Sequence, residues 1–197
     1  MPKLCFGGTF NPIHHAHLIC SRAVAEARGF ERVVLIPNSQ PRLRPNQTDL
    51  VSAEHRLAMC RLAVQGSANF EVDDLELRRE GPSYTIDTVR ELKSRGWSEV
   101  SWLIGGDGLL QLPQWHRIDE LLREATFIVM ARPGFRFDWQ QLPPQFRHLQ
   151  TNVVEAPLID LSATQIRTRC RSGLSIEYLT PPAVVDYILQ HGLYRPG

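Results

Sequence analysis

The sequence contains no long hydrophobic run. No stretch of its 197 residues approaches about 18 consecutive apolar residues, the length at which a membrane-spanning helix becomes a candidate. The N-terminal Met1-Pro2-Lys3 leads directly into a short strand-like segment, unlike the long apolar region of a signal peptide. An excess of charge is also missing, because 22 basic residues stand against 21 acidic ones. We therefore expect no membrane partner and no nucleic acid held by a basic face.

Cysteine pairs of the kind that mark disulfide frameworks or zinc ribbons are absent too. The four cysteines are widely spaced and include no C-x-x-C pair: Cys5, Cys20, Cys60 and Cys170. Free thiols are typical of a reducing compartment, so we expect a cytoplasmic protein. Lysine occurs only twice beside 20 arginines, so an arginine at a phosphate site carries weight through its position rather than its type.

Short apolar segments alternate with segments of helical apolar spacing along the chain. The apolar segments predict strands at residues 4–6, 33–36, 70–72, 100–104, 127–130 and 153–154. The helical spacing predicts helices at residues 17–28, from about 52, from 86 to before 96, at 118–123, after 162 and at 181–190. This alternation predicts an α/β fold: a Rossmann-like, doubly wound parallel sheet with helices on both faces, in a single domain over residues 1–197. Ligands of such sheets bind beyond the carboxyl ends of the strands.

The first candidate site follows the first predicted strand. Gly7 and Gly8 open a loop that runs from Thr9 to His17, where a helix begins. Glycine lets the backbone approach a ligand closely, and the free N–H groups of a helix N-terminus favour phosphate. His14 and His17, three residues apart, can face the same side and donate hydrogen bonds to phosphate oxygens. The competing interpretation is a tight turn with surface histidines.

A metal centre is an alternative use of the same histidines. His14, His17 and Cys20 follow an i, i+3, i+6 spacing that can present three ligands from one helix face. No fourth ligand and no supporting carboxylate lies nearby in the sequence, so we expect no metal held by protein ligands. Stoichiometric zinc in protein purified without added metal would favour this alternative.

The second candidate site opens the helix after the last predicted strand. Ser162 is a natural N-cap, while Thr164 and Arg167 place a hydroxyl and a fork of N–H donors where they can hold a triphosphate. Read alone, this segment is equally well a capped helix with an exposed arginine. Its meaning therefore depends on the first site.

Together the two segments resemble the nucleotidyltransferase superfamily. The run from Gly7 to His17 is similar to its H-x-G-H signature, and the run from Ser162 to Arg167 is similar to its S-x-T-x-x-R phosphate motif. Within the superfamily the chain most resembles the bacterial nicotinate-nucleotide adenylyltransferases. That closer resemblance is carried by residues 36–44, 52–57, 81–88, 104–107, 131–134 and 178–194. The G-P-S-Y-T-x-D-T stretch and the G-x-D segment leading to Trp115 single out the pyridine-nucleotide branch.

The resemblance implies which residues bind ATP. His14, His17 and Arg167 would be the catalytic residues, because they contact the phosphates of ATP. The other implied ATP-binding residues are Gly7, Gly8, Phe10, Arg44, Asp107, Ser162 and Thr164. Of these, Asp107 would meet the adenosine ribose, and Gly7, Gly8 and Phe10 would line the same pocket. Ser162 and Thr164 would hold the β- and γ-phosphates together with Arg167.

On the acceptor side the resemblance implies two contacts. Thr85 would hydrogen-bond the pyridine carboxylate with help from backbone N–H groups. Trp115 would stack on the ring, since an aromatic face suits a cationic pyridinium. Without the resemblance, Trp115 is as readily interpreted as a partly buried core residue.

Three residues depart from the family pattern. Ala16 replaces the glycine of H-x-G-H and adds a methyl group near the expected path of the triphosphate, which matters if the backbone needs a positive φ or a very close approach. Arg44 stands where lysine is usual, which keeps the charge but changes the geometry of phosphate contact. Gly106 stands where alanine is common. None of these removes a side chain that the chemistry requires, so we expect activity.

The implied reaction is adenylyl transfer from ATP to nicotinate mononucleotide, which gives nicotinate adenine dinucleotide and pyrophosphate in NAD biosynthesis. The acceptor phosphate is already an anionic nucleophile, so neither a general base nor a covalent enzyme intermediate is needed. Mg²⁺, carried mainly by the substrate phosphates, is the expected cofactor.

The sequence leaves other functions open. Nicotinamide mononucleotide differs from the nicotinate form by few atoms, and the sequence does not display the backbone donors that would separate them. Phosphopantetheine is a more distant acceptor, against which Thr85 and Trp115 argue. A non-catalytic nucleotide-binding module weakened by Ala16 is a further alternative. A homo-oligomer is compatible with the sequence.

Overall fold

The computed structural model describes residues 2–39 and 49–195. Within these residues, six parallel strands form one sheet in the order β3-β2-β1-β4-β5-β6. The strands are β1 (Lys3–Gly8), β2 (Arg32–Pro37), β3 (Phe70–Val72), β4 (Ser101–Gly105), β5 (Thr126–Ala131) and β6 (Val153–Glu155). The strand order reverses at β1, between its neighbours β2 and β4. This is the doubly wound, Rossmann-like arrangement that the sequence predicts.

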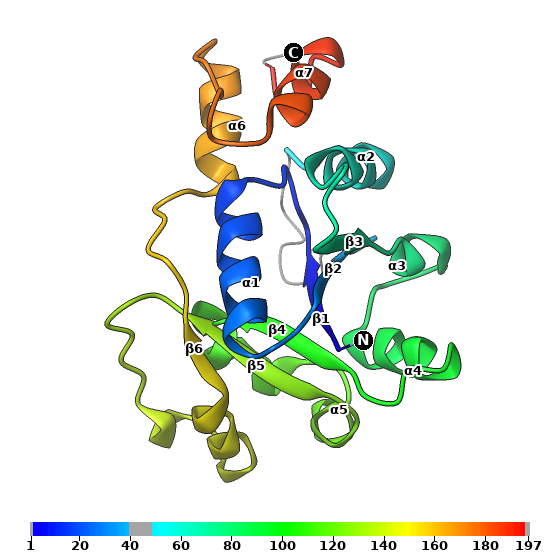
Figure 1. The fold of residues 1–197 in the computed structure, drawn as a ribbon, viewed down its shortest axis with the longest axis vertical. Helices are drawn as coiled ribbons and strands as arrows, with labels where there is room; N and C mark the ends of the chain where they lie inside the picture. The colour runs from blue at the N-terminus through cyan, green and yellow to red at the C-terminus, as the bar shows by residue number, and fades with distance from the viewer. Residues whose placement is uncertain (1, 40–48, 196–197) are drawn as a thin grey trace.

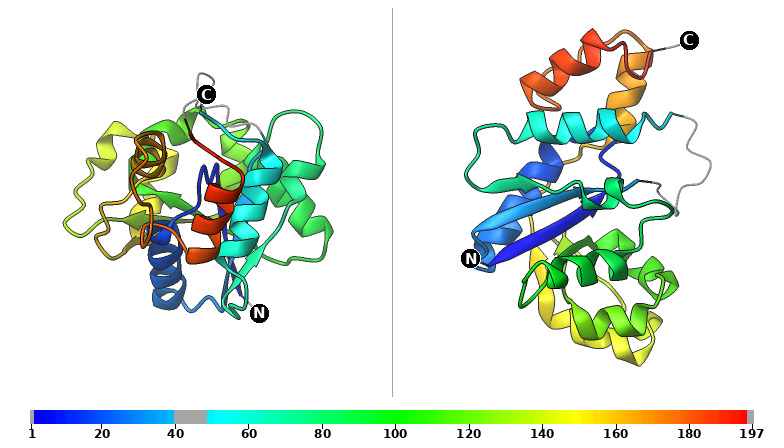
Figure 2. Two further views of the ribbon diagram at one scale, coloured as in Figure 1. Left: turned by 90° about the horizontal axis from the view of Figure 1, so that it is seen from above. Right: turned by 90° about the vertical axis from the view of Figure 1, so that its right-hand side faces the viewer.

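Helices cover both faces of this sheet (Figure 1). The α-helices are α1 (His15–Ala27), α2 (Ala53–Ala63), α3 (Leu75–Arg78), α4 (Thr85–Ser94), α5 (Ile118–Glu124), α6 (Ala163–Arg171) and α7 (Pro182–Gln190). Three segments are 3-10 helices: η1 (Gly106–Gln114), η2 (Trp139–Gln141) and η3 (Pro144–Asn152). The right-hand view of Figure 2 shows α2, α6 and α7 on one side of the strands and α4 and α5 on the other.

Alternate side chains of the central strands β1, β2, β4 and β5 enter two different hydrophobic cores. In β1, Leu4 and Phe6 join the core that packs against α1, α2, α6 and α7, whereas Cys5 joins the core that packs against α4, α5 and η1. In β4, Leu103 belongs to the first core and Trp102 to the second. Because both faces are covered, these central strands are apolar after their first residue instead of alternating with polar residues. This is why short continuous apolar runs mark them in the sequence.

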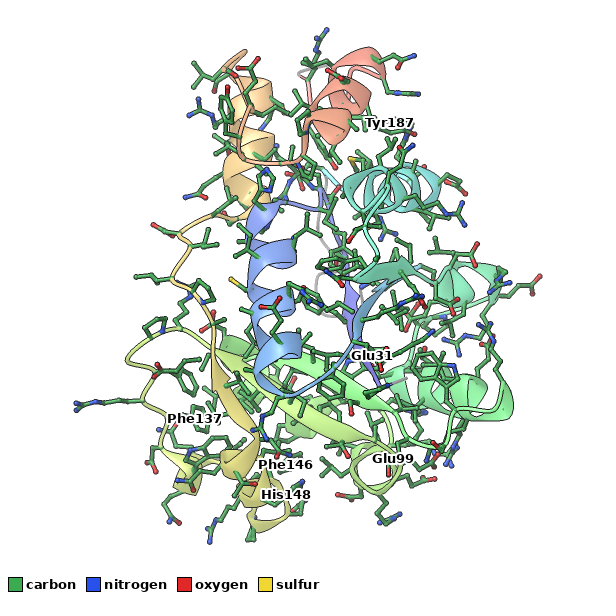
Figure 3. The ribbon with its side chains drawn as sticks, in the orientation of Figure 1. Glu31, Glu99, Phe137, Phe146, His148 and Tyr187 are labelled. Atoms are coloured by element: carbon green, nitrogen blue, oxygen red, sulfur yellow. The ribbon has the colours of Figure 1, made fainter. Side chains whose placement is uncertain are left out.

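The structure confirms the predicted strands and helices, and it adds elements that the sequence did not predict. These are α3, η1, η2 and η3, all short or of the 3-10 type. In η3, Phe146 is buried in the second core while His148 lies at the surface (Figure 3). In the described part of the chain, every helix is too short or too polar to cross a bilayer.

The two C-terminal helices lie together at one end of the molecule (Figure 1). On α7, the hydroxyl of Tyr187 lies 3.0 Å from Nδ1 of His55 on α2 (Figure 3). The ring of His191 stacks on Tyr187 with centroids 4.0 Å apart. The contact between Tyr187 and His55 fixes α7 against α2.

Candidate active site

β1 and β4 are neighbouring parallel strands, with Cys5 paired to Trp102 in register, so their carboxyl ends point towards the same edge of the sheet. The chain leaves β1 through residues 9–14, here called the histidine loop, and enters α1. It leaves β4 at Gly105 and enters η1. These two connections go to opposite faces of the sheet, because α1 packs in the first core and η1 in the second. A crevice between such loops is the usual binding place in doubly wound sheets.

Gly7 and Gly8 are required by the packing of the protein itself. A Cβ atom on Gly7 would lie 2.5 Å from Cζ2 of Trp102, and one on Gly8 would lie 2.8 Å from Cζ of Phe10. Separations this short force a shift of an indole or a phenyl ring that is itself buried. The two glycines therefore let β1 and its loop lie close to these rings, whatever they contribute to a ligand.

Phe10 supports a catalytic candidate. Its backbone φ is +46°, a left-handed conformation that is uncommon for a bulky residue, and its side chain is 2% exposed. The ring packs edge-on against His17, with centroids 5.2 Å apart, and against Phe6 at 5.5 Å. A role of Phe10 in lining the nucleotide pocket would thus fall to its backbone, while its ring holds the imidazole of His17.

His14 and His17 lie together at the start of α1. Their rings stack with centroids 3.6 Å apart and an angle of 24° between planes. The backbone N–H of His14 donates to Nδ1 of His17 at 3.3 Å. Since Nδ1 accepts, the neutral imidazole of His17 carries its proton on Nε2, which can donate to a ligand. Nδ1 of His14 is buried and has no hydrogen-bond partner among the described residues.

Both imidazoles are held in the neutral form. Burial lowers the pKa of His14 from 6.5 to about 4, with a smaller contribution from His15. Burial also lowers the pKa of His17 well below its ordinary value, and the neighbouring His14 adds to this effect. At neutral pH these side chains therefore act as hydrogen-bond donors and not as cations.

Acid should destabilise the fold through these histidines. A histidine whose pKa is lower in the folded state binds fewer protons there, so its contribution is full above about pH 6.5 and is lost as the pH falls towards about 4. For His14 this shift corresponds to about 3 kcal/mol in the free energy of unfolding. Urea unfolding across this range measures the loss, and His14→Gln should show a shallower pH dependence. If the free energy of unfolding of His14→Gln depends on pH as steeply as that of the wild type, the lowered pKa of His14 is not the cause of the pH dependence.

Ala16 sits in regular helix. It is the second residue of α1 and does not have a positive φ, so the concern that this position needs a left-handed backbone does not apply. We expect Ala16→Gly to lower the free energy of unfolding by about 1 kcal/mol, because glycine disfavours helix. We also expect the KM for ATP to change little. A large gain in turnover, measured by pyrophosphate release, would show instead that the methyl group obstructs the triphosphate.

The phosphate motif caps α6 and reaches back to the histidine loop. Ser162 is the N-cap, with its hydroxyl accepting from the backbone N–H of Gln165 at 3.2 Å while the Gln165 side chain accepts from the Ser162 N–H at 2.7 Å. Arg167 is buried and donates through Nη1 to the backbone carbonyl of Asn11 at 2.9 Å. Its Nη2 lies 3.3 Å from the hydroxyl of Thr164. The two sequence motifs, far apart in the chain, thus meet in one place.

Asp49 is an acidic partner of this arginine that the sequence did not reveal. Its carboxylate accepts from Nε of Arg167 at 2.6 Å and from Nη1 of Arg171 at 3.0 Å. The side chain of Arg167 is 7% exposed, whereas that of Arg171 is 42% exposed. Asp49 therefore fixes the orientation of the buried guanidinium. No sequence signal marked it, since it stands outside both motifs.

Asn11 in the histidine loop connects this loop by hydrogen bonds to residues 49–51, to α6 and to the C-terminal segment. Its Nδ2 donates to the backbone carbonyl of Asp49 at 3.0 Å, and its Oδ1 accepts from the N–H of Val51 at 3.3 Å and from the hydroxyl of Tyr194 at 2.8 Å. Its own carbonyl receives Arg167. Asn11 belongs to the quoted motif, but a sequence does not show which asparagine has all its groups paired in this way.

The C-terminal segment closes over the histidine loop. Three hydrogen bonds join them: Thr180 Oγ1 to the carbonyl of Ile13 at 2.7 Å, the N–H of His15 to the carbonyl of Leu179 at 3.1 Å, and the Tyr194 hydroxyl to Asn11. Thr180 is fully buried. The loop is therefore held on the sheet side by β1 and on the outer side by the last part of the chain.

The acceptor candidates belong to two elements whose ends lie close together. Thr85 is the first residue of α4, and Trp115 follows η1 directly. Their neighbours Tyr84 and His116 stack with ring centroids 4.1 Å apart. Trp115 is half-buried and packs edge-on against Phe127 at 6.0 Å. The arrangement places an aromatic ring near a helix N-terminus, where N–H groups favour an anion.

Asp107 and Arg44 complete the predicted ATP-binding set. Asp107 is the second residue of η1 and its side chain is 88% exposed, with one oxygen 3.7 Å from Nη2 of Arg132. It is therefore open to a ligand hydroxyl. Arg44 lies outside the described residues.

The three side chains of the metal-centre alternative make other contacts in the structure. The imidazoles of His14 and His17 stack, and the thiol of Cys20 donates to the carbonyl of Pro157 at 3.4 Å. Among residues 2–39 and 49–195, no three histidine, cysteine or acidic side chains form a group that could hold a metal ion.

Comparisons with known proteins identify the family of this chain. The cytidylyltransferase-like family model matches residues 5–169. A protein of Herpetosiphon aurantiacus named "Probable nicotinate-nucleotide adenylyltransferase" is 41% identical over 192 residues, covering 95% of this chain and 96% of its own length. One of the same name from Pectobacterium atrosepticum is 40% identical and covers 99% and 100%. The chain belongs to the cytidylyltransferase-like family, among the nicotinate-nucleotide adenylyltransferases.

Solved structures of nicotinate-nucleotide adenylyltransferases share the fold. The nicotinic acid mononucleotide adenylyltransferase of Plasmodium falciparum complexed with NaAD has a TM-score of 0.75 at 19% identity, covering 98% of both chains. The same protein complexed with APC has a TM-score of 0.73 at 18% identity, again covering 98% of both. At this level of identity the likeness establishes the fold.

Proposed function

We propose that this chain transfers the adenylyl group of ATP to nicotinate mononucleotide, releasing pyrophosphate. The observation that carries the proposal is the hydrogen bond between Arg167 and the backbone of Asn11, which joins the two phosphate-binding motifs beside the strand-order reversal. Membership of the nicotinate-nucleotide adenylyltransferases supports the same reaction. The nucleotidyltransferase domain is proposed to span residues 1–197.

The ATP phosphates would lie between α1 and α6. Nε2 of His17 would donate to a phosphate oxygen, His14 would donate beside it, and Arg167 would supply the positive charge of the site. Arg44 and the N-terminal ends of α1 and α6 would assist, with Ser162 and Thr164 on the β- and γ-phosphates. Because the histidines are neutral, the site gains donors without adding buried cations that would hold the product.

The chemistry requires orientation more than proton transfer. An oxygen of the acceptor's 5′-phosphate attacks the α-phosphorus of ATP, and the bond from that phosphorus to the bridging oxygen of the β-phosphate breaks in line with it. The electron pair leaves on pyrophosphate, whose growing charge the donors stabilise. The attacking phosphate oxygen is already ionised, and the bridging oxygen leaves as an anion on pyrophosphate, so no residue needs to act as a general base.

A divalent ion, proposed to be Mg²⁺, would arrive on the ATP phosphates. The described residues contain no group of three metal-binding side chains, which fits an ion carried by substrate and water and not by a protein cage. When bound, it would neutralise phosphate charge. The chain's own part is then to hold the nucleotide through Arg167 and the two histidines.

The acceptor site favours the acid form of the pyridine nucleotide. The carboxylate of nicotinate would lie at the N-terminus of α4 beside Thr85, where the helix dipole stabilises a negative charge and does little for a neutral amide. Trp115 would stack on the cationic ring.

The described cysteines are free thiols, which supports a cytoplasmic enzyme.

Pyrophosphate release tests the proposal directly. The purified chain is given ATP and Mg²⁺ with nicotinate mononucleotide, nicotinamide mononucleotide or phosphopantetheine as acceptor. We expect release with the nicotinate form, slower release with the amide and none with phosphopantetheine. Thr85→Val keeps the shape of the side chain but removes its hydroxyl, and it should narrow the preference for the acid. ATP binding without pyrophosphate release from any acceptor would overturn the enzymatic assignment.

A further inference from the structure

Arg56 is a fully buried arginine that the proposed chemistry does not use. It lies on α2 with an exposed fraction of 0% and belongs to the S-A-E-H-R-L stretch of the family resemblance. Burying a guanidinium is costly unless its donors are all paired. A group of this cost in the interior calls for a reason beyond filling space.

Four acceptors receive its N–H groups. Nη1 donates to the backbone carbonyl of Thr9 at 2.8 Å and to Oδ1 of Asn38 at 3.3 Å. Nη2 donates to the carbonyl of Ser39 at 2.9 Å, and Nε to the carbonyl of Val51 at 3.4 Å. Within the described part of the chain, all of these partners are neutral. The guanidinium is thus a connector of backbone segments and not half of an ion pair.

The segments that it connects belong to different sides of the candidate site. Thr9 lies in the loop between Gly8 and the histidines, on the ATP side. Ser39 follows β2, and its backbone N–H donates to the hydroxyl of Ser83 at 3.0 Å, while the two hydroxyls lie 2.9 Å apart. Ser83 stands two residues before Thr85 at the start of α4. Ser39 is thus the intermediate residue through which Arg56 links two segments. These are residues 7–12, here called the ATP loop, and residues 81–85, here called the acceptor loop.

We propose that Arg56 is a positioning residue that fixes the ATP loop against the acceptor loop, and so sets the distance between the two phosphates that react. This proposal rests on the proposed adenylyl transfer. The planar guanidinium of Arg56 suits this positioning role, because its N–H groups point in fixed directions and reach acceptors from three segments at once. The ammonium of a lysine cannot reach all of them from one place.

Kinetics of Arg56→Ala and Arg56→Lys test the proposal. Both should lower kcat by about 100-fold, the cost of misplacing reacting groups by about 1 Å, while each KM changes much less. Added guanidinium should restore part of the lost kcat in Arg56→Ala but not in Arg56→Lys, and urea, a neutral molecule of the same shape, should not. Arg61→Ala is the matched control, because Arg61 lies on the same helix with its side chain 58% exposed.

Amide hydrogen exchange provides a readout that does not depend on turnover. In Arg56→Ala we expect faster exchange in residues 7–12 and 81–85 together, and guanidinium should slow both. If only one segment responds, or if the variant merely unfolds at a lower temperature with its kcat intact, Arg56 is a structural residue and the proposal is wrong. A wild-type chain that releases no pyrophosphate would refute the proposed function, whereas the exchange result would still decide whether Arg56 couples the loops.

Discussion

Replacing His17 by alanine is expected to lower kcat/KM for adenylyl transfer by about 100- to 1,000-fold, the usual cost of removing one preorganised donor from a transition-state site. The reason is that its Nδ1 accepts from the backbone of His14, which leaves the proton on Nε2 as the donor proposed for a phosphate oxygen. Initial rates of pyrophosphate release at saturating nicotinate mononucleotide measure the loss. The unfolding transition, followed in parallel, should shift by about 1 kcal/mol, because the helix loses a capping contact.

His17→Gln separates these two effects. Glutamine at this position of a helix can accept from the N-cap backbone through its side-chain oxygen, so the stability should return. The rate should not return to the wild-type value, because the imidazole and its edge contact with Phe10 are gone. If His17→Gln regains both stability and full rate, then capping α1 is the only role of His17 and the donor role is excluded.

Arg167 should show the second large effect. Arg167→Lys keeps the charge, but an ammonium cannot bridge Asp49, the Asn11 carbonyl and the Thr164 hydroxyl at once. We expect kcat/KM to fall by about 100-fold or more, with much of the loss in kcat. The free energy of unfolding should fall by about 2 kcal/mol, because hydrogen bonds to a charged, buried group are lost.

Arg171→Lys is the control for that experiment. Arg171 contacts the same carboxylate of Asp49, but its side chain is largely in solvent, where ion pairs contribute little. Its substitution should leave both rate and stability close to wild type. Equal losses of rate and stability in Arg167→Lys and Arg171→Lys would mean that any arginine beside Asp49 contributes equally. A specific role of Arg167 in the site would then be excluded.

Much of the fold follows from local sequence signals. The strands are short apolar runs because both faces of the sheet are covered, and Ser52 and Ser162 begin α2 and α6 as N-caps whose hydroxyls accept from the backbone. The missed η1 has an equally local reason. It is a 3-10 helix that contains Pro113, and a proline inside a helical stretch normally argues against a helix.

The candidate site was predicted only in part, because its geometry depends on long-range contacts. The glycines, the histidines and the Ser162–Arg167 motif could be named from spacing and family resemblance. Asn11, Asp49 and Arg56 gain their meaning from partners that are distant in the sequence, which no local pattern encodes. The charge of the histidines also escaped the sequence, since their lowered pKa values come from burial under neighbouring rings.

The hydrogen bonds that hold the histidine loop from above determine when the enzyme can begin to work. Residues 11–15 are translated well before their partners Leu179, Thr180 and Tyr194. A nascent chain that has been made only as far as α6 can form β1 and α1 but has nothing to close over the loop. We therefore expect nucleotide binding to start only after residues 179–194 have been made and have left the ribosome.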